Sequence, residues 1–136
     1  MGSLQEFLMG DEVVIDRNPV AVDIKPFPSP FLIHAITEEE NQIIRKSCQS
    51  VTFDKRTRQK RVEVDQDAYN KKLVTACCAD PNFKDAGFQE KFGVRGEEEL
   101  IGRLLKPGQF IELLLAVQDV NGFSGGMEEL VDEAKN

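Results

Sequence analysis

The sequence contains few residues whose spacing could support catalysis. Residues 122–126, Gly-Phe-Ser-Gly-Gly, match the G-x-S-x-G pattern of hydrolase nucleophiles. In that motif the serine sits on a strand-to-helix turn, and the histidine of the triad follows it along the chain. Here a helical pattern precedes the serine, and the single histidine, His34, comes before it. We therefore interpret residues 122–126 as a helix stop and hinge, and we predict no catalytic residues and no enzymatic activity.

The cysteines and the histidine do not form a ligand or redox pattern. His34 has no second histidine beside it, whereas metal sites need several ligands at defined spacing. Cys77 and Cys78 are adjacent, and the C-x-x-C spacing of redox sites does not occur. We predict that these two cysteines pack in the core and that they and Cys48 are reduced thiols. We expect no metal and no cofactor.

A cluster of basic residues lies in the middle of the chain. It comprises Lys55, Arg56, Arg58, Lys60 and Arg61. Such a run can contact phosphates, but no aromatic residue is interleaved for stacking on bases. The whole chain has 17 basic and 24 acidic residues, a net charge of -7, which disfavours nucleic acid and anionic membranes. We predict a solvated loop, with a nucleic-acid-associated regulatory protein binding through residues 55–61 as the alternative.

The C-terminal residues have an acidic, amphipathic pattern. Met127, Leu130 and Val131 fall on one face of a predicted helix over residues 127–134, and four acidic residues lie between Glu128 and Glu133. Such a segment can dock on its own domain or lay its apolar stripe in a groove of a partner. Both alternatives stay open. With Phe123, which precedes the hinge, these three apolar residues are our candidates for binding a partner protein.

The elements that position these residues change character along the chain. Ser3 is expected to cap a short helix, and residues 13–15, 20–24 and 31–36 have the β-branched pattern of two or three antiparallel strands. Thr37 and Glu40 form a capping box for a helix that ends near Cys48, and residues 50–62 are expected to be a polar connection. Further helices are predicted at residues 66–79, 84–92, 96–106, 107–122 and 127–134. The helix from Pro107 is apolar on nearly every side, which predicts a central, buried helix.

Together these elements predict an α+β fold, with a small N-terminal antiparallel sheet of two or three strands packed on a mainly helical body of four or five helices. A chain of 136 residues can bury enough surface to fold as one domain. We divide it into residues 1–36, 37–122 and 123–136. No apolar run approaches the ~20 residues that span a bilayer, and the N-terminus does not resemble a signal peptide. These features predict a cytoplasmic protein.

Several blocks of sequence, in this order, resemble one family. They include Ala-Ile-Thr-Glu-Glu-Glu-Asn at 35–41, Asp-Pro-Asn-Phe-Lys-Asp-Ala at 80–86, Leu-Leu-Lys-Pro-Gly at 104–108 and Val-Gln-Asp-Val-Asn-Gly-Phe at 117–123. Over nearly its whole length the chain resembles the XkdN-like tail assembly chaperones of phages and defective prophages of Gram-positive bacteria. The resemblance implies a factor that binds the tape measure protein and keeps it soluble during tail morphogenesis. It also implies the tail tube protein as a further partner and leaves homo-oligomerisation open.

Overall fold

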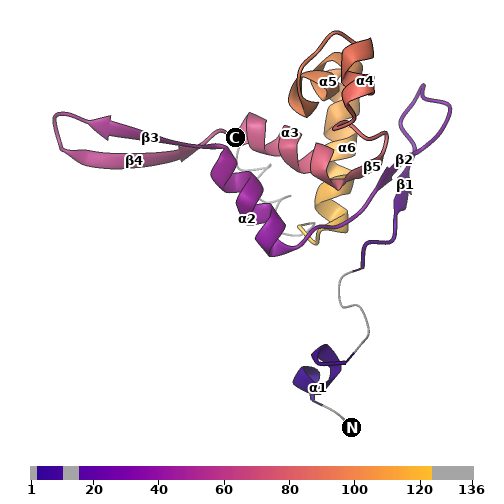
Figure 1. The fold of residues 1–136 in the computed structure, drawn as a ribbon, viewed down its shortest axis with the longest axis horizontal. Coiled ribbons are helices and arrows are strands. Elements are labelled where there is room, and N and C mark those ends of the chain that lie inside the picture. The colour runs from indigo at the N-terminus through magenta and orange to yellow at the C-terminus, as the bar shows by residue number, and fades with distance from the viewer. Residues whose placement is uncertain (1–2, 11–15, 124–136) are drawn as a thin grey trace.

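A computed structural model describes residues 3–10 and 16–123 and shows an α+β fold (Figure 1). Strands β1 (Val20–Val22), β2 (Phe31–Ile33) and β5 (Cys78–Asp80) form an antiparallel sheet with β2 in the centre. This sheet lies beside a body of five helices that follow residue 37 within the described part of the chain. The predicted fold class is therefore confirmed. The predicted strand over residues 13–15 lies outside the described residues.

Local capping signals begin two helices of the body as the sequence predicts. The hydroxyl of Thr37 accepts a hydrogen bond from the backbone N–H of Glu40 at 3.1 Å, and the Glu40 carboxylate accepts one from the backbone N–H of Thr37 at 3.1 Å. Asp65 caps the second of these helices by accepting from the N–H of Ala68 at 3.2 Å. The five helices are α2 (Glu38–Ser47), α3 (Gln66–Cys77), α4 (Ala86–Lys91), α5 (Glu97–Leu104) and α6 (Pro107–Val120).

Helix α3 is the centre of the packing. It contacts α2, α5 and α6, and one buried cluster joins these helices to the sheet. Cys77 and Cys78 belong to this cluster, as does Cys48, and all three are free thiols, as predicted. Burial raises the pKa of the Cys78 thiol to about 12 and also raises the pKa of Cys77, so both stay protonated at neutral pH. In this environment they act as small apolar side chains.

Helix α3 is shorter than predicted because its last residues join the sheet. The sequence pattern predicted a helix through Ala79, but α3 ends at Cys77 and the chain continues as strand β5. In the sheet, Cys78 pairs with Ile33 and Asp80 pairs with Leu32. The backbone groups of β5 thereby bond to a strand more than forty residues earlier, a partner that helical spacing does not reveal.

Residues 50–62, which we predicted to be a polar connection, form a β-hairpin instead. Its strands are β3 (Gln49–Asp54) and β4 (Gln59–Val64), joined by a four-residue turn in which Arg58 has a φ of 57°. Val51 and Phe53 alternate with polar residues in β3, as Val62 and Val64 do in β4, and this period of two is typical of strands. The clustered basic residues of the turn masked that alternation, although it was present in the sequence.

Helix α6 is buried on one side only, which corrects the prediction of a fully buried helix. Leu113 and Val117 are fully buried, whereas Ile111 and Leu115 are 54% and 51% exposed. The buried side meets α3 and β1, and the opposite side of α6 has no comparable layer among the described elements. Its predicted ends are confirmed: Pro107 opens it, and Gly122 follows it with a φ of 84°.

None of the described helices combines the length and the apolar composition that spanning a membrane requires.

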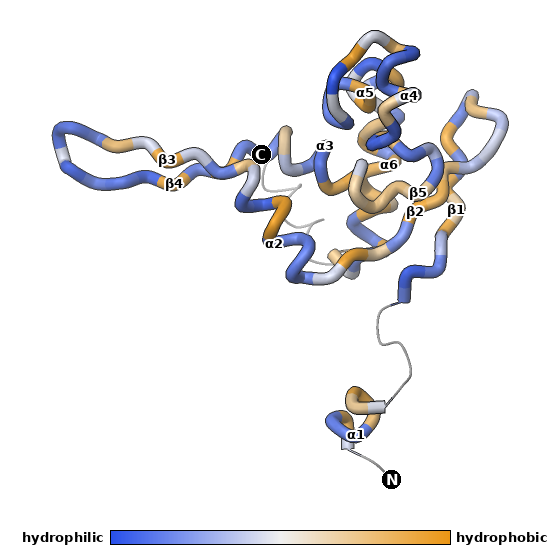
Figure 2. Tube along the Cα trace, viewed as in Figure 1, coloured by the Kyte–Doolittle hydropathy of each residue, from blue (hydrophilic) through white to orange (hydrophobic). Residues whose placement is uncertain are grey.

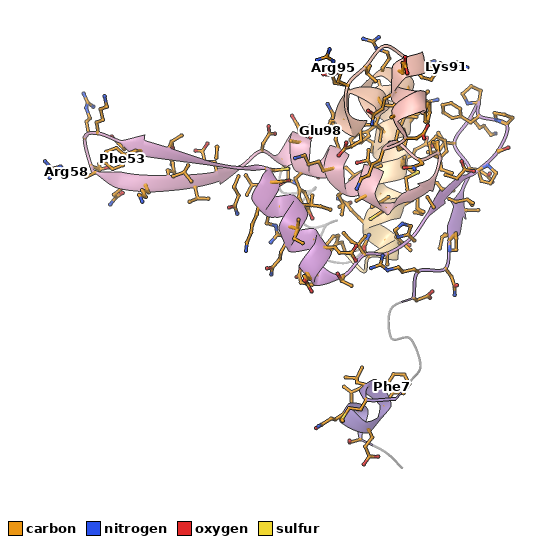
Figure 3. All side chains as sticks on the ribbon, viewed as in Figure 1. Phe7, Phe53, Arg58, Lys91, Arg95 and Glu98 are labelled. Carbon is orange, nitrogen blue, oxygen red and sulfur yellow. The ribbon has the colours of Figure 1, made fainter. Side chains whose placement is uncertain are left out.

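Helix α1 (Leu4–Leu8) precedes the sheet and lies apart from the helical body in Figure 1. As predicted, Ser3 caps it, with its hydroxyl accepting from the N–H of Glu6 at 3.3 Å. Leu4, Phe7 and Leu8 are all exposed, and Phe7 is labelled in Figure 3. The helix therefore presents a short apolar stripe at one end of the chain.

Candidate interaction surface

The most distinctive surface in the described part of the chain is the β3–β4 hairpin. It extends away from the body between the end of α2 and the start of α3 (Figure 1). A hydrogen bond from the N–H of Asp65 to the carbonyl of Cys48, 2.9 Å long, closes its base. Every residue of both strands is exposed. The hairpin is therefore a projection whose side chains on both faces are accessible.

The register of the two strands sorts the side chains of the hairpin into two faces. Residues that pair directly across two strands share a face, and successive residues alternate between faces. Val51 pairs with Val62, Phe53 with Lys60, and Gln49 with Val64, so Val51, Phe53, Val62 and Val64 lie together. We call these four residues the apolar face. The opposite face carries three polar pairs: Ser50 with Glu63, Thr52 with Arg61, and Asp54 with Gln59.

The apolar face is exposed. Val51, Val62 and Phe53 are 63%, 58% and 57% exposed, and Val64 at the base is 37% exposed. Figure 2 shows hydrophobic stretches on the two strands of an otherwise hydrophilic hairpin, and Figure 3 shows Phe53 in its distal part. An isolated two-stranded hairpin is only marginally stable in water, and strands normally bury one face. Exposed apolar surface of this kind is a candidate interaction site.

The five basic residues singled out in the sequence are all on this hairpin, and all are exposed. Lys55, Arg56 and Arg58 lie in the turn, and Lys60 and Arg61 lie on β4. With the acidic Asp54 and Glu63, residues 49–64 carry a net charge of 5 − 2 = +3, so the rest of the chain carries -7 − 3 = -10. The structure therefore separates a basic, partly apolar projection from a strongly acidic remainder.

A buried polar seam between α2 and α3 supports the base of the hairpin. The hydroxyl of Tyr69 donates a hydrogen bond to the side-chain oxygen of Asn41, and the Asn41 amide donates one to Glu38 at 2.8 Å. The Arg45 guanidinium lies over the Tyr69 ring, 5.8 Å from its centroid. Burial raises the pKa of Tyr69, which keeps the phenol protonated and able to donate. These contacts fix how the two helices that flank the hairpin meet.

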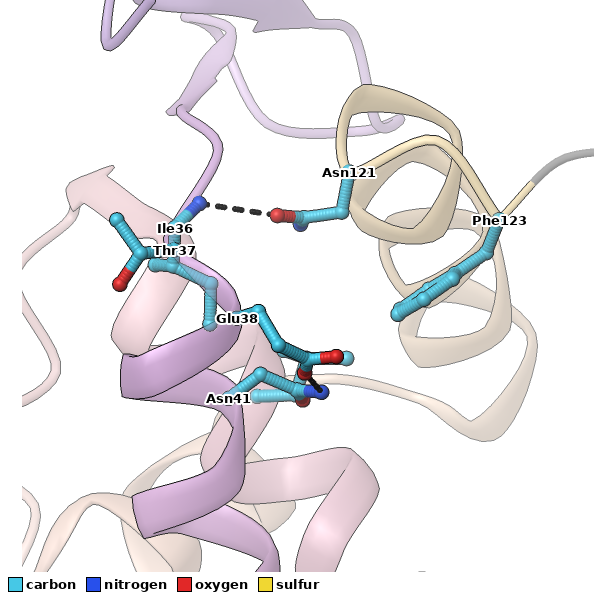
Figure 4. A pocket seen from close by; sticks show the side chains of 7 residues that line it. Ile36, Thr37, Glu38, Asn41, Asn121 and Phe123 are labelled. Carbon is cyan, nitrogen blue, oxygen red and sulfur yellow. Dashed lines mark hydrogen bonds between the residues drawn. The ribbon is translucent and has the colours of Figure 1, made fainter. Parts of the chain in front are cut away.

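The predicted partner-binding residues have different outcomes. Phe123 is half-buried and packs against the core of its own chain, where it lines a pocket of about 130 Å³ with Glu38 and Asn41 of α2 (Figure 4). Next to it, the Asn121 side chain accepts a hydrogen bond from the N–H of Ile36 at 2.9 Å. Met127, Leu130 and Val131 lie outside the described residues, and their role in binding a partner stays a prediction.

The residues first considered for chemistry do not converge in the described part of the chain. His34 is half-buried, and its Nδ1 lies 2.9 Å from the carbonyl oxygen of Ala35. Residues 3–10 and 16–123 hold no group of three or more His, Cys, Asp or Glu side chains that could bind a metal ion. Ser124 lies outside the described residues. Among the described residues, the exposed surface best suited to binding is that of the hairpin.

Comparisons with known proteins identify one family and several similar proteins. The family described as phage XkdN-like tail assembly chaperone protein matches residues 4–135. Two proteins of Bacillus subtilis strain 168 align over 128 residues, 93% of this chain and 85% of theirs: the uncharacterized protein YqbN at 27% identity and the phage-like element PBSX protein XkdN at 25%. The crystal structure of the protein YqbN matches 90% of this chain and 98% of its own, with a TM-score of 0.65 and 20% identity, which shows a shared fold.

Proposed function

The chain belongs to the family of phage XkdN-like tail assembly chaperones, and from that premise we propose that it binds a tape measure protein and keeps it soluble during tail morphogenesis. The family gives the general role and makes phage tail proteins the class of partner. The tape measure protein as client, the tail tube protein as a later partner and the host cytoplasm as the place of action are parts of our proposal.

The observation that carries this proposal is the exposed apolar face of the hairpin. A protein that keeps an aggregation-prone chain in solution needs apolar surface that is accessible yet does not join to itself. Val51, Phe53 and Val62 supply that surface, and all three are more than half exposed. The basic residues of the same hairpin repel a second hairpin, in the way that charged residues protect exposed strands from pairing with one another. The hairpin thus combines binding surface with protection against self-association.

The C-terminal residues are proposed as a second contact with the client. Met127, Leu130 and Val131 share one face of a predicted helix, a pattern that suits docking in an apolar groove. Phe123, which precedes the hinge, completes this proposed set. Because its side chain is half-buried beside α2, Phe123 is better placed to anchor the start of the segment than to contact the client directly.

Co-expression with the longest open reading frame immediately downstream in the source genome tests the proposal. We expect that product to be recovered in the soluble fraction, and to co-elute with the chaperone, only when the chaperone is present. Phe53→Ser should reduce this recovery, whereas Phe7→Ser should not. Phe7 is the matched control for Phe53, because the two side chains are 54% and 57% exposed and lie on different elements. A client that is insoluble with and without the chaperone would remove the proposal.

A second candidate function, nucleic-acid binding through residues 55–61, is favoured by one observation. Phe53 pairs with Lys60 beside the basic turn, so an exposed aromatic ring does lie next to cationic side chains. Stacking on an aromatic ring combined with phosphate contacts is how single strands are bound. The charge of -10 on the rest of the chain opposes such binding. This candidate requires oligonucleotide affinity that falls steeply with salt and is lost when the five basic residues are changed to serine.

A further inference from the structure

We propose that strand β4 of the hairpin binds an extended, acidic segment of a partner protein as a third strand. The backbone of that segment pairs with the outer edge of β4, its apolar side chains lie beside Val62 and Val64, and a carboxylate lies beside Lys60. The inference rests on the proposed function, because the segment belongs to the client. It adds how the client is held and what sequence pattern it must contain.

The first support is a row of outward-pointing backbone groups along β4. The N–H of Asp65 bonds to the carbonyl of Cys48, which makes these two residues a hydrogen-bonded pair at the base of the hairpin. Hydrogen-bonded and non-hydrogen-bonded pairs alternate along an antiparallel ladder. The non-hydrogen-bonded pairs, whose backbone N–H and C=O groups point away from the other strand, are therefore Gln49 and Val64, Val51 and Val62, and Phe53 and Lys60.

The outward groups of β4 are accessible to a partner. Among the described residues, no backbone group outside the hairpin forms a hydrogen bond with Lys60, Val62 or Val64. The hairpin also extends away from the body, which leaves room beside its strands (Figure 1). An open strand edge is a template for the addition of an extended chain. A helix cannot pair with it, because the backbone groups of a helix bond to one another. The edge therefore favours an extended partner.

The second support is charge, which favours β4 over β3 and an acidic partner over a basic one. β4 carries Lys60 and Arg61, whereas β3 has no basic residue and ends at Asp54. On the polar face, Arg61 lies 3.8 Å from the carboxylate of Glu63. Lys60 shares the apolar face with Val62 and forms no ion pair within the described part of the chain. A carboxylate directly across from Lys60 on an added strand supplies the missing partner.

The register turns these features into a sequence pattern. Residues directly across from one another on neighbouring strands share a face, and residues of one strand that share a face are two positions apart. The partner therefore needs apolar, preferably β-branched, residues opposite Val62 and Val64 and a carboxylate opposite Lys60. In the antiparallel direction, the more stable of the two, the pattern reads apolar-x-apolar-x-acidic. The third strand also widens the apolar face to the size at which a sheet becomes stable by itself.

Other occupants of the edge fit less well. The hairpin of a second copy brings a net charge of +3 against +3. Nucleic acid has no peptide groups to pair with a strand and meets the charge of -10 on the rest of the chain. An amphipathic helix can cover the apolar face through its side chains, but it leaves the backbone groups of β4 unpaired. The experiment below separates these cases.

A synthetic peptide, acetyl-Thr-Val-Thr-Val-Glu-Glu-Thr-amide, tests the proposal on the full-length protein. Amide hydrogen exchange followed by NMR reads each backbone group of the hairpin separately. We expect the N–H groups of Lys60, Val62 and Val64 to exchange fast in the free protein and to become protected when the peptide is bound. The N–H groups of Val51 and Phe53, which point outward from the opposite edge, should exchange fast in both states.

Proline variants separate the edge of β4 from the apolar face. Val62→Pro removes an outward N–H of β4, and Val51→Pro, directly across the hairpin, removes one of β3. The two side chains are 58% and 63% exposed, so the variants lose similar apolar surface. Val62→Pro should weaken peptide binding roughly fivefold or more, because it removes a backbone hydrogen bond to the partner. Val51→Pro should have little effect, and Val62→Thr, which keeps the N–H, should weaken binding less than Val62→Pro.

Charge reversal tests the acidic partner. Lys60→Glu should weaken binding of the glutamate peptide roughly tenfold, since an attractive cross-strand pair becomes a repulsive one. A peptide with lysine in place of both glutamates should bind Lys60→Glu better than it binds the wild type. Lys55→Glu makes the same change of charge in the turn, away from β4, and should have a much smaller effect on either peptide.

The opposing outcomes are distinct. No protection of β4 at millimolar peptide, or protection of Val51 and Phe53 instead, overturns the proposal. Equal weakening by Val62→Pro and Val51→Pro assigns binding to side chains of the apolar face, and equal binding of the glutamate and lysine peptides removes the acidic partner; either result also overturns it. Protection of Val62 in the free protein that is lost on dilution assigns the edge to a second copy, with the same consequence.

The test stays decisive if a proline variant fails to fold, because the exchange pattern of the unsubstituted protein already identifies the edge. The peptide replaces the client, so its failure to bind leaves the co-expression result for the chaperone function untouched. Conversely, a peptide that binds β4 as expected, together with a client that stays insoluble, would remove the proposed function and keep the strand-addition site.

Discussion

Tyr69 of α3 donates a hydrogen bond to Asn41 of α2, and both side chains are buried where the two helices meet. The hairpin joins the C-terminal end of α2 to the N-terminal end of α3. A buried polar contact between these helices therefore sets the position of the surface that we propose to bind partners. Its removal should affect the stability of the body as well as the support of the hairpin.

Tyr69→Phe should lower the free energy of unfolding by roughly 1–3 kcal/mol, because it leaves the Asn41 oxygen in the seam without its donor. Urea unfolding followed by circular dichroism measures this change. In a double-mutant cycle with Asn41→Ala, the two substitutions should cost less together than the sum of their separate effects. An unchanged urea midpoint for Tyr69→Phe, or strict additivity, would show that the hydrogen bond contributes nothing to stability.

Glu40 predicts a dependence of stability on acid pH. Its pKa lies below the ordinary value of 4.5, mainly because its carboxylate accepts a hydrogen bond from the backbone of Thr37, with further help from the Thr37 hydroxyl and the charge of Arg17. A lowered folded-state pKa means that the carboxylate stabilises the fold above pH 4.5 and that this contribution disappears as pH falls through the folded-state value.

Glu40→Gln keeps the capping box but removes the charge, so it isolates this effect. The wild type should unfold at a higher temperature than Glu40→Gln at pH 7, and the difference should vanish in strongly acidic buffer. Thr37→Ala is the matched control. It should cost roughly 0.5–2 kcal/mol at neutral pH, because it removes the capping hydroxyl itself. A difference between wild type and Glu40→Gln that persists unchanged into acid would contradict this account.

Substitutions on the apolar face should leave folding of the body intact. Val51→Ser/Val62→Ser changes two exposed side chains away from the core, so we expect the free energy of unfolding to change by no more than about 0.5 kcal/mol per site. Leu113→Ala, at a fully buried position of α6, should cost roughly 2–5 kcal/mol. Thermal unfolding of both variants distinguishes these cases. A large loss for the hairpin variant would contradict the exposure of Val51 and Val62 and would show that these side chains are packed in the folded protein.

The buried thiols should be unreactive in the folded protein. Burial raises the pKa of Cys78 to about 12 and also raises that of Cys77, and only the thiolate is alkylated. Iodoacetamide at pH 8 should therefore modify both residues slowly in buffer and quickly in denaturant, with mass spectrometry locating the adducts. Rapid modification of the folded protein at either position would show that this part of the core opens readily.

Much of the helical body could be predicted because helix ends are local. The Thr37–Glu40 capping box, the Asp65 cap and the glycine stop after α6 each act within a few residues, and the structure contains all three. The hairpin was also encoded locally, in the alternation of Val51, Phe53, Val62 and Val64, although the basic and polar residues between them are also typical of a solvated connection. Strand β5 could not be predicted in this way, because its pairing with β2 depends on residues far away in the chain and produces no local sequence pattern.

The sequence by itself determined the caps that begin α2 and α3, the acidic balance of the chain and its resemblance to the XkdN-like family, because caps, charges and ordered sequence blocks are properties of the chain. Only the tertiary structure decided that Cys78–Asp80 joins the sheet, that Phe123 is half-buried beside α2, and that the apolar face of the hairpin is exposed. The reason is physical: exposure depends on which distant elements pack against a side chain, and that packing is settled by the whole fold rather than by local spacing.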